Sequence, residues 1–306
     1  MTRRCGFAAV IGAPNAGKST LTNRLVGAKV SIVTQKVQTT RFPVRGVALA
    51  DEAQIVLVDT PGIFQPRRRL DRAMVRSAWG GAEDADAVVH LVDAPAQLGD
   101  SPADRRAQAD VETIIAGLKA SGKAAILALN KVDAVKREAL LGVSAALYET
   151  GAYDEAFMIS ASTGSGVDDL KAKLAERMPE GEWLYPEDQT ADLPARLLAA
   201  EITREKLYLR VHEELPYSAA VETTAFQERK DGGVRIEQTI YVERESQRPI
   251  ILGKGGQTLK WIGQKSREDL SVILDRPVHL FLHVTVDERW ADKRAFYGDL
   301  GLDYDA

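Results

Sequence analysis

The sequence contains a single cysteine, Cys5, among its 306 residues. One cysteine forms neither an internal disulfide nor a thiolate metal cluster, which is typical of proteins of the reducing cytosol. No apolar run approaches the roughly 18 residues that a membrane-spanning helix needs, so that class is excluded. The short apolar stretch at 6–13 follows two arginines like a signal peptide, but it leads directly into a glycine-rich motif, so we interpret it as a buried strand.

An excess of basic charge is also lacking, since 40 Lys and Arg residues face 44 Asp and Glu residues and the net charge is −4. The overall positive charge of a typical nucleic-acid-binding protein is therefore absent. One stretch departs from this average, because residues 244–267 contain six basic residues and one acidic residue. Such a run is usually a solvated helix face, so its meaning depends on the motif that it surrounds.

The order of apolar and amphipathic segments predicts two domains and a linker. Residues 1–178 alternate between apolar runs and helix-like stretches, which predicts an α/β domain with a mostly parallel sheet flanked by helices. The expected strands are 7–11, 43–50, 54–58, 87–92, 124–129 and 156–159, and the expected helices are 17–26, 70–82, 103–121, 136–150 and 166–178. Residues 179–194 contain several prolines and no clear period, so we expect a linker.

The remaining residues, 195–306, predict a small α+β domain. A helix over 195–212 precedes two strands, 217–229 and 234–243, which the hairpin signal at Asp231 joins. Two short helices separated by residues 253–256 and a final strand over 278–286 complete it.

The stretch Gly12–Ser19 fits the phosphate-loop pattern G-x-x-x-x-G-K-[ST] and lies between a predicted strand and a predicted helix. Its glycines allow backbone N–H groups to approach phosphates, and the helix amino terminus adds partial positive charge. We expect Lys18 to reach the β- and γ-phosphates and the Ser19 hydroxyl to ligate Mg²⁺.

Three further motifs follow predicted strands; one completes the Mg²⁺ and γ-phosphate site and two contact guanine. Asp59–Gly62 offers a carboxylate for the Mg²⁺ shell and a glycine N–H for the γ-phosphate. Asn130–Asp133 offers a carboxylate, Asp133, that accepts from guanine N1–H and N2–H₂, a donor pair that adenine lacks. Ser160 and Ala161 place a backbone N–H near the guanine O6. Ligands of open α/β sheets bind at this edge. The guanine-specific motif Asn130–Asp133 disfavours a metabolic P-loop kinase.

These motifs resemble those of the translation-factor-like GTPases, and Gln38–Arg41 resembles their first switch segment. The resemblance implies that Thr39 or Thr40 closes over Mg²⁺, and Thr40 is favoured. Ile63 stands where Ras-like proteins have a water-positioning glutamine, so slow hydrolysis is expected. GTPases with an asparagine at the position of Asn15 often bind K⁺ beside the phosphates, which makes K⁺ a hypothesis here.

The predicted GTP site thus has three overlapping residue sets. The catalytic residues are Lys18, Thr40, Asp59 and Gly62, and the Mg²⁺ ligands are Ser19, Thr40 and Asp59. The nucleotide-binding residues are Gly12, Ala13, Pro14, Asn15, Ala16, Gly17, Lys18, Ser19, Thr20, Asp59, Thr60, Pro61, Gly62, Ile63, Asn130, Lys131, Val132, Asp133, Ser160 and Ala161.

The second domain carries a G-x-x-G loop, Gly253–Gly256, within the basic stretch. With the order helix, strand, strand, helix, loop, helix, strand, it resembles a type II KH domain, whose loop approaches the backbone of single-stranded RNA. The expected RNA-binding residues are Arg244, Arg248, Gly253, Lys254, Gly255, Gly256, Lys260 and Lys265.

The whole chain resembles the Era family, the branch of the TrmE–Era–EngA-like GTPases with a C-terminal KH domain. The resemblance includes 5–7, 185–188, 242–247 and 277–280. It implies a monomeric, slowly hydrolysing GTPase that binds the 3′ end of 16S rRNA and assists 30S subunit assembly, in the cytoplasm and peripherally at the inner membrane. Two alternatives remain open at this point: an RNA-binding module that nucleotide does not gate, and a GTPase of the tRNA-modification type.

Overall fold

The computed structural model describes residues 2–34, 36, 38–211 and 215–306. It divides the chain into two compact units. The first unit contains Met1–Ser31, Thr40–Asp192 and Leu300–Ala306, and the second contains Ile32–Thr39 and Leu193–Asp299. This division differs from the expected boundaries in three places, namely 32–39, the linker and the last residues of the chain.

The linker falls in the first unit because its backbone pairs with strands of that unit. Pro179 accepts a hydrogen bond from Cys5 N at 3.0 Å, and Thr190 accepts one from Val47 N at 2.9 Å. The buried Gln54 side chain accepts from the N–H groups of Leu184 and Tyr185 at 2.9 and 3.0 Å. Residues that lack a regular period are therefore fixed here by hydrogen bonds to an ordered sheet.

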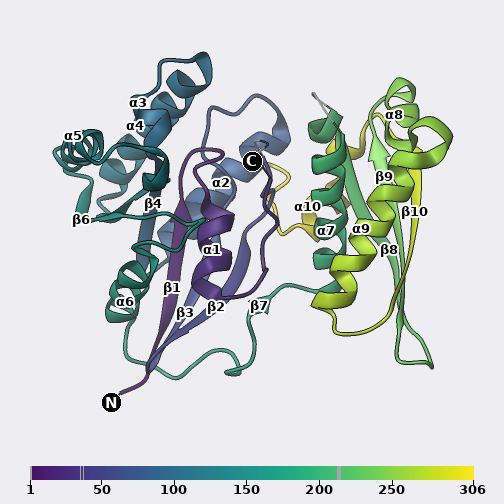
Figure 1. Ribbon diagram of the computed structural model, residues 1–306, viewed down its shortest axis with the longest axis horizontal. Helices are drawn as coiled ribbons and strands as arrows, with labels where there is room; N and C mark the ends of the chain where they lie inside the picture. Colours follow the sequence, from purple (N-terminus) through teal and green to yellow (C-terminus); the bar gives the residue numbers. More distant parts are fainter. Residues whose placement is uncertain (1, 35, 37, 212–214) are drawn as a thin grey trace. The chain divides into compact units, whose positions relative to one another are not determined.

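A sheet of seven strands forms the centre of the first unit, in the order β6-β5-β4-β1-β3-β2-β7 (Figure 1). Its central neighbours are parallel, and β2 runs antiparallel to β3. The strands are β1 (Arg4–Ile11), β2 (Val44–Ala50), β3 (Ala53–Asp59), β4 (Ala87–Asp93), β5 (Ala125–Asn130), β6 (Tyr153–Met158) and β7 (Ala191–Asp192). Both faces of the central strands are buried, which explains their continuous apolar sequence.

The helices of this unit are α1 (Lys18–Val26), α2 (Arg69–Asp84), α3 (Ala94–Leu98), α4 (Pro102–Ser121), α5 (Arg137–Tyr148) and α6 (Val167–Arg177). They form two hydrophobic clusters with alternate residues of the sheet. Leu21 of α1 and Leu170 of α6 pack with Val10, whereas Ile114 of α4 packs with Ile11. The apolar residues that recur with a helical period in the helices thus pack against alternate residues of the strands, in one cluster on each face of the sheet.

The expected helices and strands of this unit agree with the observed ones to within three residues at either end, and two observed elements, α3 and the short strand β7, are absent from the expected set. Helix α3 was not expected, although Asp93 caps it by accepting from Ala96 N at 3.4 Å and Pro95 lies in its first turn. Strands β1 and β6 begin three residues before the expected positions, at Arg4 and Tyr153, and in β6 the polar residues Asp154 and Glu155 interrupt the apolar pattern.

His90 lies in the centre of this sheet, fully buried, with its Nδ1 2.8 Å from the Tyr153 hydroxyl. Burial, aided by the positive charge of Lys18, lowers the pKa of His90 to about 3. The unfolded chain therefore binds this proton more readily, and the free energy of unfolding decreases as the pH falls from about 6.5 toward 3.

We expect His90 to make the protein about 2 kcal/mol less stable at pH 5 than at pH 7, since each unit of pH below the unfolded pKa costs about 1.4 kcal/mol. Urea denaturation of His90→Gln at both pH values should show this difference reduced. The matched control is His283→Gln, which removes an exposed imidazole. An unchanged pH dependence in His90→Gln would contradict the assignment.

The second unit contains helix α7 (Ala195–Arg210) and a sheet of three strands in the order β10-β9-β8. Strands β8 (Ala219–Glu228) and β9 (Val234–Val242) are antiparallel, and β10 (Val278–Val286) is parallel to β9. The predicted hairpin is present, with Arg229 N donating to Gly233 O at 2.9 Å. The expected helix end at His212 lies outside the described residues.

Helix α8 (Arg248–Leu252), the turn Lys254–Gly256 and helix α9 (Gln257–Ile273) follow β9, and α10 (Arg294–Asp299) comes after β10. The expectation of two short helices is wrong for α9, which has 17 residues. Its apolar face packs on the sheet through Ile262 and Leu270. Among the described residues, no helix is long and apolar enough to cross a membrane.

Candidate functional site

The phosphate-loop motif forms the turn between β1 and α1, at the carboxyl edge of the sheet. Gly17 has a φ of 100°, a left-handed conformation that favours glycine, and a Cβ there would lie 2.5 Å from the Asn130 amide nitrogen. The turn and the guanine motif thus pack against each other, which explains why this position has no side chain.

Lys18 is buried at the start of α1, where its Nζ donates to the carbonyl oxygens of Gly12 and Ala13 at 3.0 and 2.9 Å. Burial lowers its pKa to about 8, although the carboxylates of Asp59 and Asp110 oppose this shift. A desolvated ammonium inside a loop of backbone groups is a binding site for an anion.

The three predicted magnesium ligands lie in mutual contact. The Ser19 hydroxyl donates to Asp59 Oδ2 at 2.8 Å and lies 2.9 Å from the Thr40 hydroxyl, which is 3.4 Å from the same carboxylate oxygen. Thr39 is directed elsewhere, with its hydroxyl 2.7 Å from that of Thr34. Of the two threonines, the geometry therefore favours Thr40.

These groups suit Mg²⁺, which prefers oxygen ligands. Asp59 is fully buried, and its Oδ1 has no hydrogen-bond partner among the described residues. Burial raises the pKa of Asp59. The hydrogen bond from Ser19 and the charge of Lys18 oppose this shift, but the net change is upward. A buried carboxylate oxygen without a partner is costly unless a cation compensates it.

Asn130, at the end of β5, connects three of the predicted motifs. Its side-chain NH₂ donates to Ala16 O at 2.8 Å, and its Oδ1 accepts from Ala161 N at 2.9 Å. Arg24 of α1 donates to the carbonyl oxygens of Ala161 and Ser162. One buried amide thus holds the phosphate loop and the 160–161 segment in register.

The neighbouring Lys131 has a φ of 63° and donates from its Nζ to Asn15 O at 3.0 Å and to Asp93 at 2.5 Å. Asp133 is exposed in the short turn that follows, so its carboxylate is free to meet a base. Asp93 is absent from the predicted set. Its place at the carboxyl end of β4 is the signal that could have identified it.

The Asp59–Gly62 motif leads into the second switch. Ile63 N donates to Gly12 O at 3.1 Å, whereas the Ile63 side chain is 1% exposed and packs in the core. A Cβ at Gly62 would lie 3.0 Å from Pro14. The backbone of this segment therefore borders the phosphate loop, but the Ile63 side chain points away from it and cannot orient water.

In the second unit, three glycines form the turn between α8 and α9. Gly253, Gly255 and Gly256 have φ values of 73°, 60° and 77°, which other residues rarely adopt. A Cβ at Gly253 would lie 2.3 Å from Thr258 Oγ1, whereas Gly255 and Gly256 face open space. Gly253 is thus required for the start of α9, and the other two leave the surface of the turn bare.

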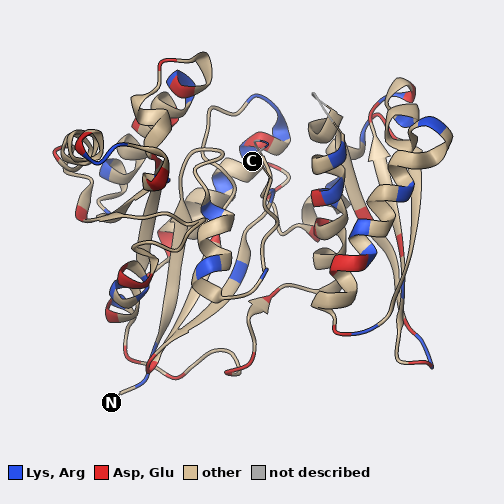
Figure 2. Cartoon of the chain, in the orientation of Figure 1, with Lys and Arg blue, Asp and Glu red and all other residues tan. Residues whose placement is uncertain are grey.

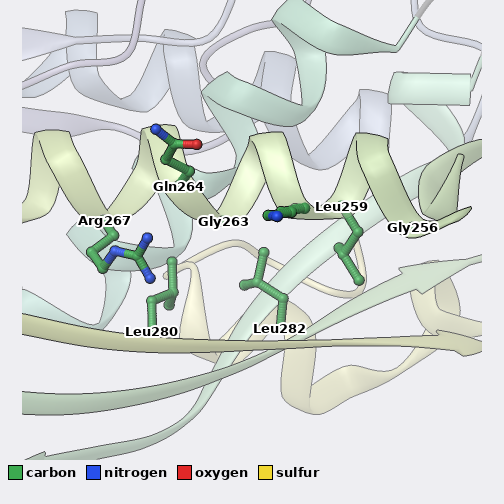
Figure 3. Close-up of a pocket in the computed structure, with 8 residues that line it drawn as sticks. Gly256, Leu259, Gly263, Gln264, Arg267, Leu280 and Leu282 are labelled. Atoms are coloured by element: carbon green, nitrogen blue, oxygen red, sulfur yellow. The ribbon is translucent and has the colours of Figure 1, made fainter.

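A surface groove of about 420 Å³ begins at this turn and runs between α9 and β10 (Figure 3). Leu259 and Arg267 extend from the helix toward the strand, and Leu280 and Leu282 extend toward the helix, as Figure 3 shows. The complete lining is Gly256, Leu259, Lys260, Gly263, Gln264, Arg267, Leu280 and Leu282. The floor is apolar and the helix side is basic.

Only Gly256 and Lys260 of the predicted RNA-binding residues line the groove. Lys254 and Gly255 are exposed in the turn, Arg244 and Arg248 are exposed before it, and Lys265 pairs with Glu268 at 2.6 Å instead. The missed lining residues Gly263, Gln264 and Arg267 follow Gly256 at helical spacing, which is a signal that the sequence contains. Basic residues appear along α9 and in the turn before α2 in Figure 2.

Comparison with known proteins identifies a family for each of the two domains. The family model of the 50S ribosome-binding GTPases matches residues 7–131, and the KH-domain model matches residues 214–291. GTPase Era of Caulobacter vibrioides is 71% identical over 99% of this chain and 97% of its own length, and GTPase Era of Maricaulis maris is 60% identical over 99% and 98%.

Two solved structures match nearly the whole chain at 38% identity, each with a TM-score of 0.87. One is a single-residue variant of Aquifex aeolicus Era bound to GDP and AlF₄⁻, which covers 97% of this chain and 99% of its own. The other is Era in complex with MgGDPNP and nucleotides 1506–1542 of 16S ribosomal RNA, with 98% and 99% covered. The chain is a P-loop GTPase with a C-terminal KH domain, and it belongs to the Era family of GTPases.

Proposed function

We propose that this GTPase binds the 3′ end of 16S rRNA through the groove between α9 and β10 and assists assembly of the 30S subunit. The observation that carries the proposal is the groove itself, where a bare glycine turn leads into an apolar floor with Lys260 and Arg267 at its side. Bases pack on such a floor while basic groups meet the phosphates. The full-length likeness to an Era bound to that rRNA segment supports the choice of RNA.

In the nucleotide site, Lys18 and the backbone N–H groups of Gly12–Ser19 would hold the phosphates, and Asp133 would accept from guanine. Ser19, Thr40 and Asp59 would hold Mg²⁺, which when bound supplies positive charge at the phosphate oxygens. Lys18 would stabilise the negative charge that develops as water displaces GDP from the γ-phosphate. With the Ile63 side chain in the core, no side chain there orients the water, and slow hydrolysis follows.

Two further inferences from the sequence stay proposals. Asn15, whose φ is 62°, would help to hold K⁺ beside the phosphates, and equal hydrolysis rates in Na⁺ and K⁺ would contradict that role. The protein would act as a monomer in the cytoplasm, with peripheral attachment to the inner membrane. Sedimentation with and without inner-membrane vesicles tests that attachment.

RNA binding is tested with a labelled RNA carrying the 16S 3′ end and a scrambled RNA of equal length, each with GDPNP and with GDP. Gly255→Asp should lower the affinity at least about tenfold, because it places a negative charge where a phosphate approaches. Gly255→Asn is the matched control, since asparagine has the same size and also tolerates a positive φ. Gly253 is unsuitable because a side chain there would disrupt α9.

Three outcomes of this experiment would count against the proposal in different ways. Equal affinity for both RNAs would contradict recognition of the 16S end. Equal losses in Gly255→Asp and Gly255→Asn would show that backbone strain, rather than charge, caused the effect. Equal affinity with GDPNP and GDP would favour an RNA-binding module that nucleotide does not gate.

A further inference from the structure

The segment that precedes Thr40 folds as part of the second unit, although its sequence position lies within the GTPase domain. Ile32 is 4% exposed and belongs to a hydrophobic cluster with Ala199 and Ile202 of α7 and Leu270 of α9. A side chain buried in this way is held as firmly as other core residues. The start of the segment is therefore anchored in the core of the second unit.

Polar contacts with α7 hold Val33 and Lys36 of this segment. Val33 N donates to Glu205 Oε1 at 3.0 Å. The Lys36 ammonium donates to the carbonyl oxygens of Tyr208 and Val211, at the carboxyl end of the helix, where a cation is favourable. Burial lowers the pKa of Lys36. The carboxyl half of α7 thus provides hydrogen-bond partners for Val33 and Lys36.

Arg204 makes the last of these contacts. Its guanidinium is 2% exposed, donates to the carbonyl oxygen of Thr39, and pairs with Glu201, to which Nε donates at 2.7 Å. The guanidinium also lies 5.2 Å from the centre of the Tyr208 ring. Burial by itself would lower the pKa of Arg204, but the Glu201 carboxylate more than reverses this effect, so the net shift is upward and the group stays charged.

The Thr39 carbonyl that Arg204 contacts directly precedes Thr40, one of the proposed Mg²⁺ ligands. The Thr39 carbonyl and the Thr40 N–H belong to the same planar peptide unit. A hydrogen bond to the Thr39 oxygen therefore restricts the orientation of this peptide unit and the position of the Thr40 nitrogen. The Thr40 hydroxyl in turn lies 2.9 Å from Ser19 and 3.4 Å from Asp59. A charged hydrogen bond within the second unit therefore holds the peptide unit to which the Thr40 N–H belongs.

We propose that Arg204, oriented by Glu201, is a positioning residue for GTP hydrolysis that acts on Thr40 through the Thr39 carbonyl. This inference rests on the role proposed above for Thr40. Thr40 is needed only when a γ-phosphate is present, so Arg204 favours the GTP-bound state over the GDP-bound state.

The test compares Arg204→Met, Arg204→Lys and Glu201→Gln in the full chain. Hydrolysis is followed over a range of Mg²⁺ concentrations, and affinities are measured for GDPNP and GDP. For Arg204→Met we expect kcat to fall about tenfold and the Mg²⁺ concentration at half-maximal rate to rise about tenfold, since a hydrogen bond to a charged group is lost. GDP affinity should stay within about twofold, and Arg204→Lys should recover part of the activity.

Arg196→Met is the matched control, because Arg196 also lies on α7 and donates to a backbone carbonyl, that of Thr223 at 2.7 Å, within the same unit. It should leave the Mg²⁺ dependence unchanged. Thermal unfolding identifies variants that fail to fold. If Arg204→Met is one of them, Arg204→Lys and Glu201→Gln decide, with smaller shifts of the same sign expected.

Thr40→Ala separates this inference from the proposal on which it rests. If Thr40→Ala weakens GDPNP binding but the Arg204 variants do not, the positioning role is wrong and the role of Thr40 stands. If Thr40→Ala has no effect, the role of Thr40 itself is wrong. Equal losses of GDP and GDPNP affinity in the Arg204 variants would show general damage and overturn the inference.

Discussion

Replacing Lys18 with methionine is expected to lower kcat for GTP hydrolysis about 10³-fold. The side chain is buried between the carbonyl groups of Gly12 and Ala13, so its ammonium is poorly hydrated and already oriented. Removing one such preorganised group from a water-poor site costs about 10² to 10³ in rate. Single-turnover hydrolysis with enzyme in excess of GTP measures the chemical step directly.

Lys123→Met provides the control for this experiment. The Lys123 ammonium also donates to backbone carbonyl groups of the first unit, Ala82 and Ala85 at 3.1 Å, but it lies on the loop after α4. Both variants lose a lysine that caps carbonyl groups, so a general loss of stability would affect them equally. A rate for Lys18→Met within tenfold of the wild type would contradict the role of Lys18.

Asp133→Asn is expected to weaken GTP binding about 10³-fold. Two hydrogen bonds from guanine to a charged acceptor are lost, and each contributes about 1.5–3 kcal/mol. Xanthine carries an oxygen at C2 where guanine carries an amine, so the amide introduced by the substitution should bind XTP better than GTP. Competition between the two nucleotides, measured with a fluorescent analogue, gives the ratio.

The control for the guanine experiment is Asp100→Asn, which makes the same chemical change at an exposed position after α3. It should leave both affinities unchanged. If GTP binds Asp133→Asn as tightly as it binds the wild type, guanine selectivity resides in other groups, of which the backbone at Ser160 and Ala161 is the first to examine.

The sequence alone was sufficient to predict most elements of the first unit, though not α3 or β7, and its ligand-binding edge. Continuous apolar runs such as 54–58 identify strands buried on both faces, and the period of about 3.6 residues identifies the helices between them. Gly12–Ser19, Asp59–Gly62 and Asn130–Asp133 each follow a strand, and parallel strands end at one edge, so their proximity follows from local patterns. The contacts of Asn130 with Ala16 and Ala161 agree with this reasoning.

The contacts between distant segments required the tertiary structure. Residues 32–39 have no strong period of their own, and nothing local indicates that Ile32 enters the core formed by α7, α9 and the second sheet. The end of the chain is similar, because Leu300–Ala306 belong to the first unit, where Asp303 pairs with Arg76 at 3.0 Å. Local patterns report which face of an element is buried, but not which distant residues cover it.

The same distinction separates Thr40, the proposed Mg²⁺ ligand, from the arginine that we propose to position it. The chemistry of Mg²⁺ and of guanine demands particular residue types at particular spacings, so those residues are recognisable in a sequence. Arg204 is one of many helical arginines, and its sequence position reveals no partner. Only the folded chain brings its guanidinium to the Thr39 carbonyl, because that contact depends on the packing of two segments separated by more than 160 residues.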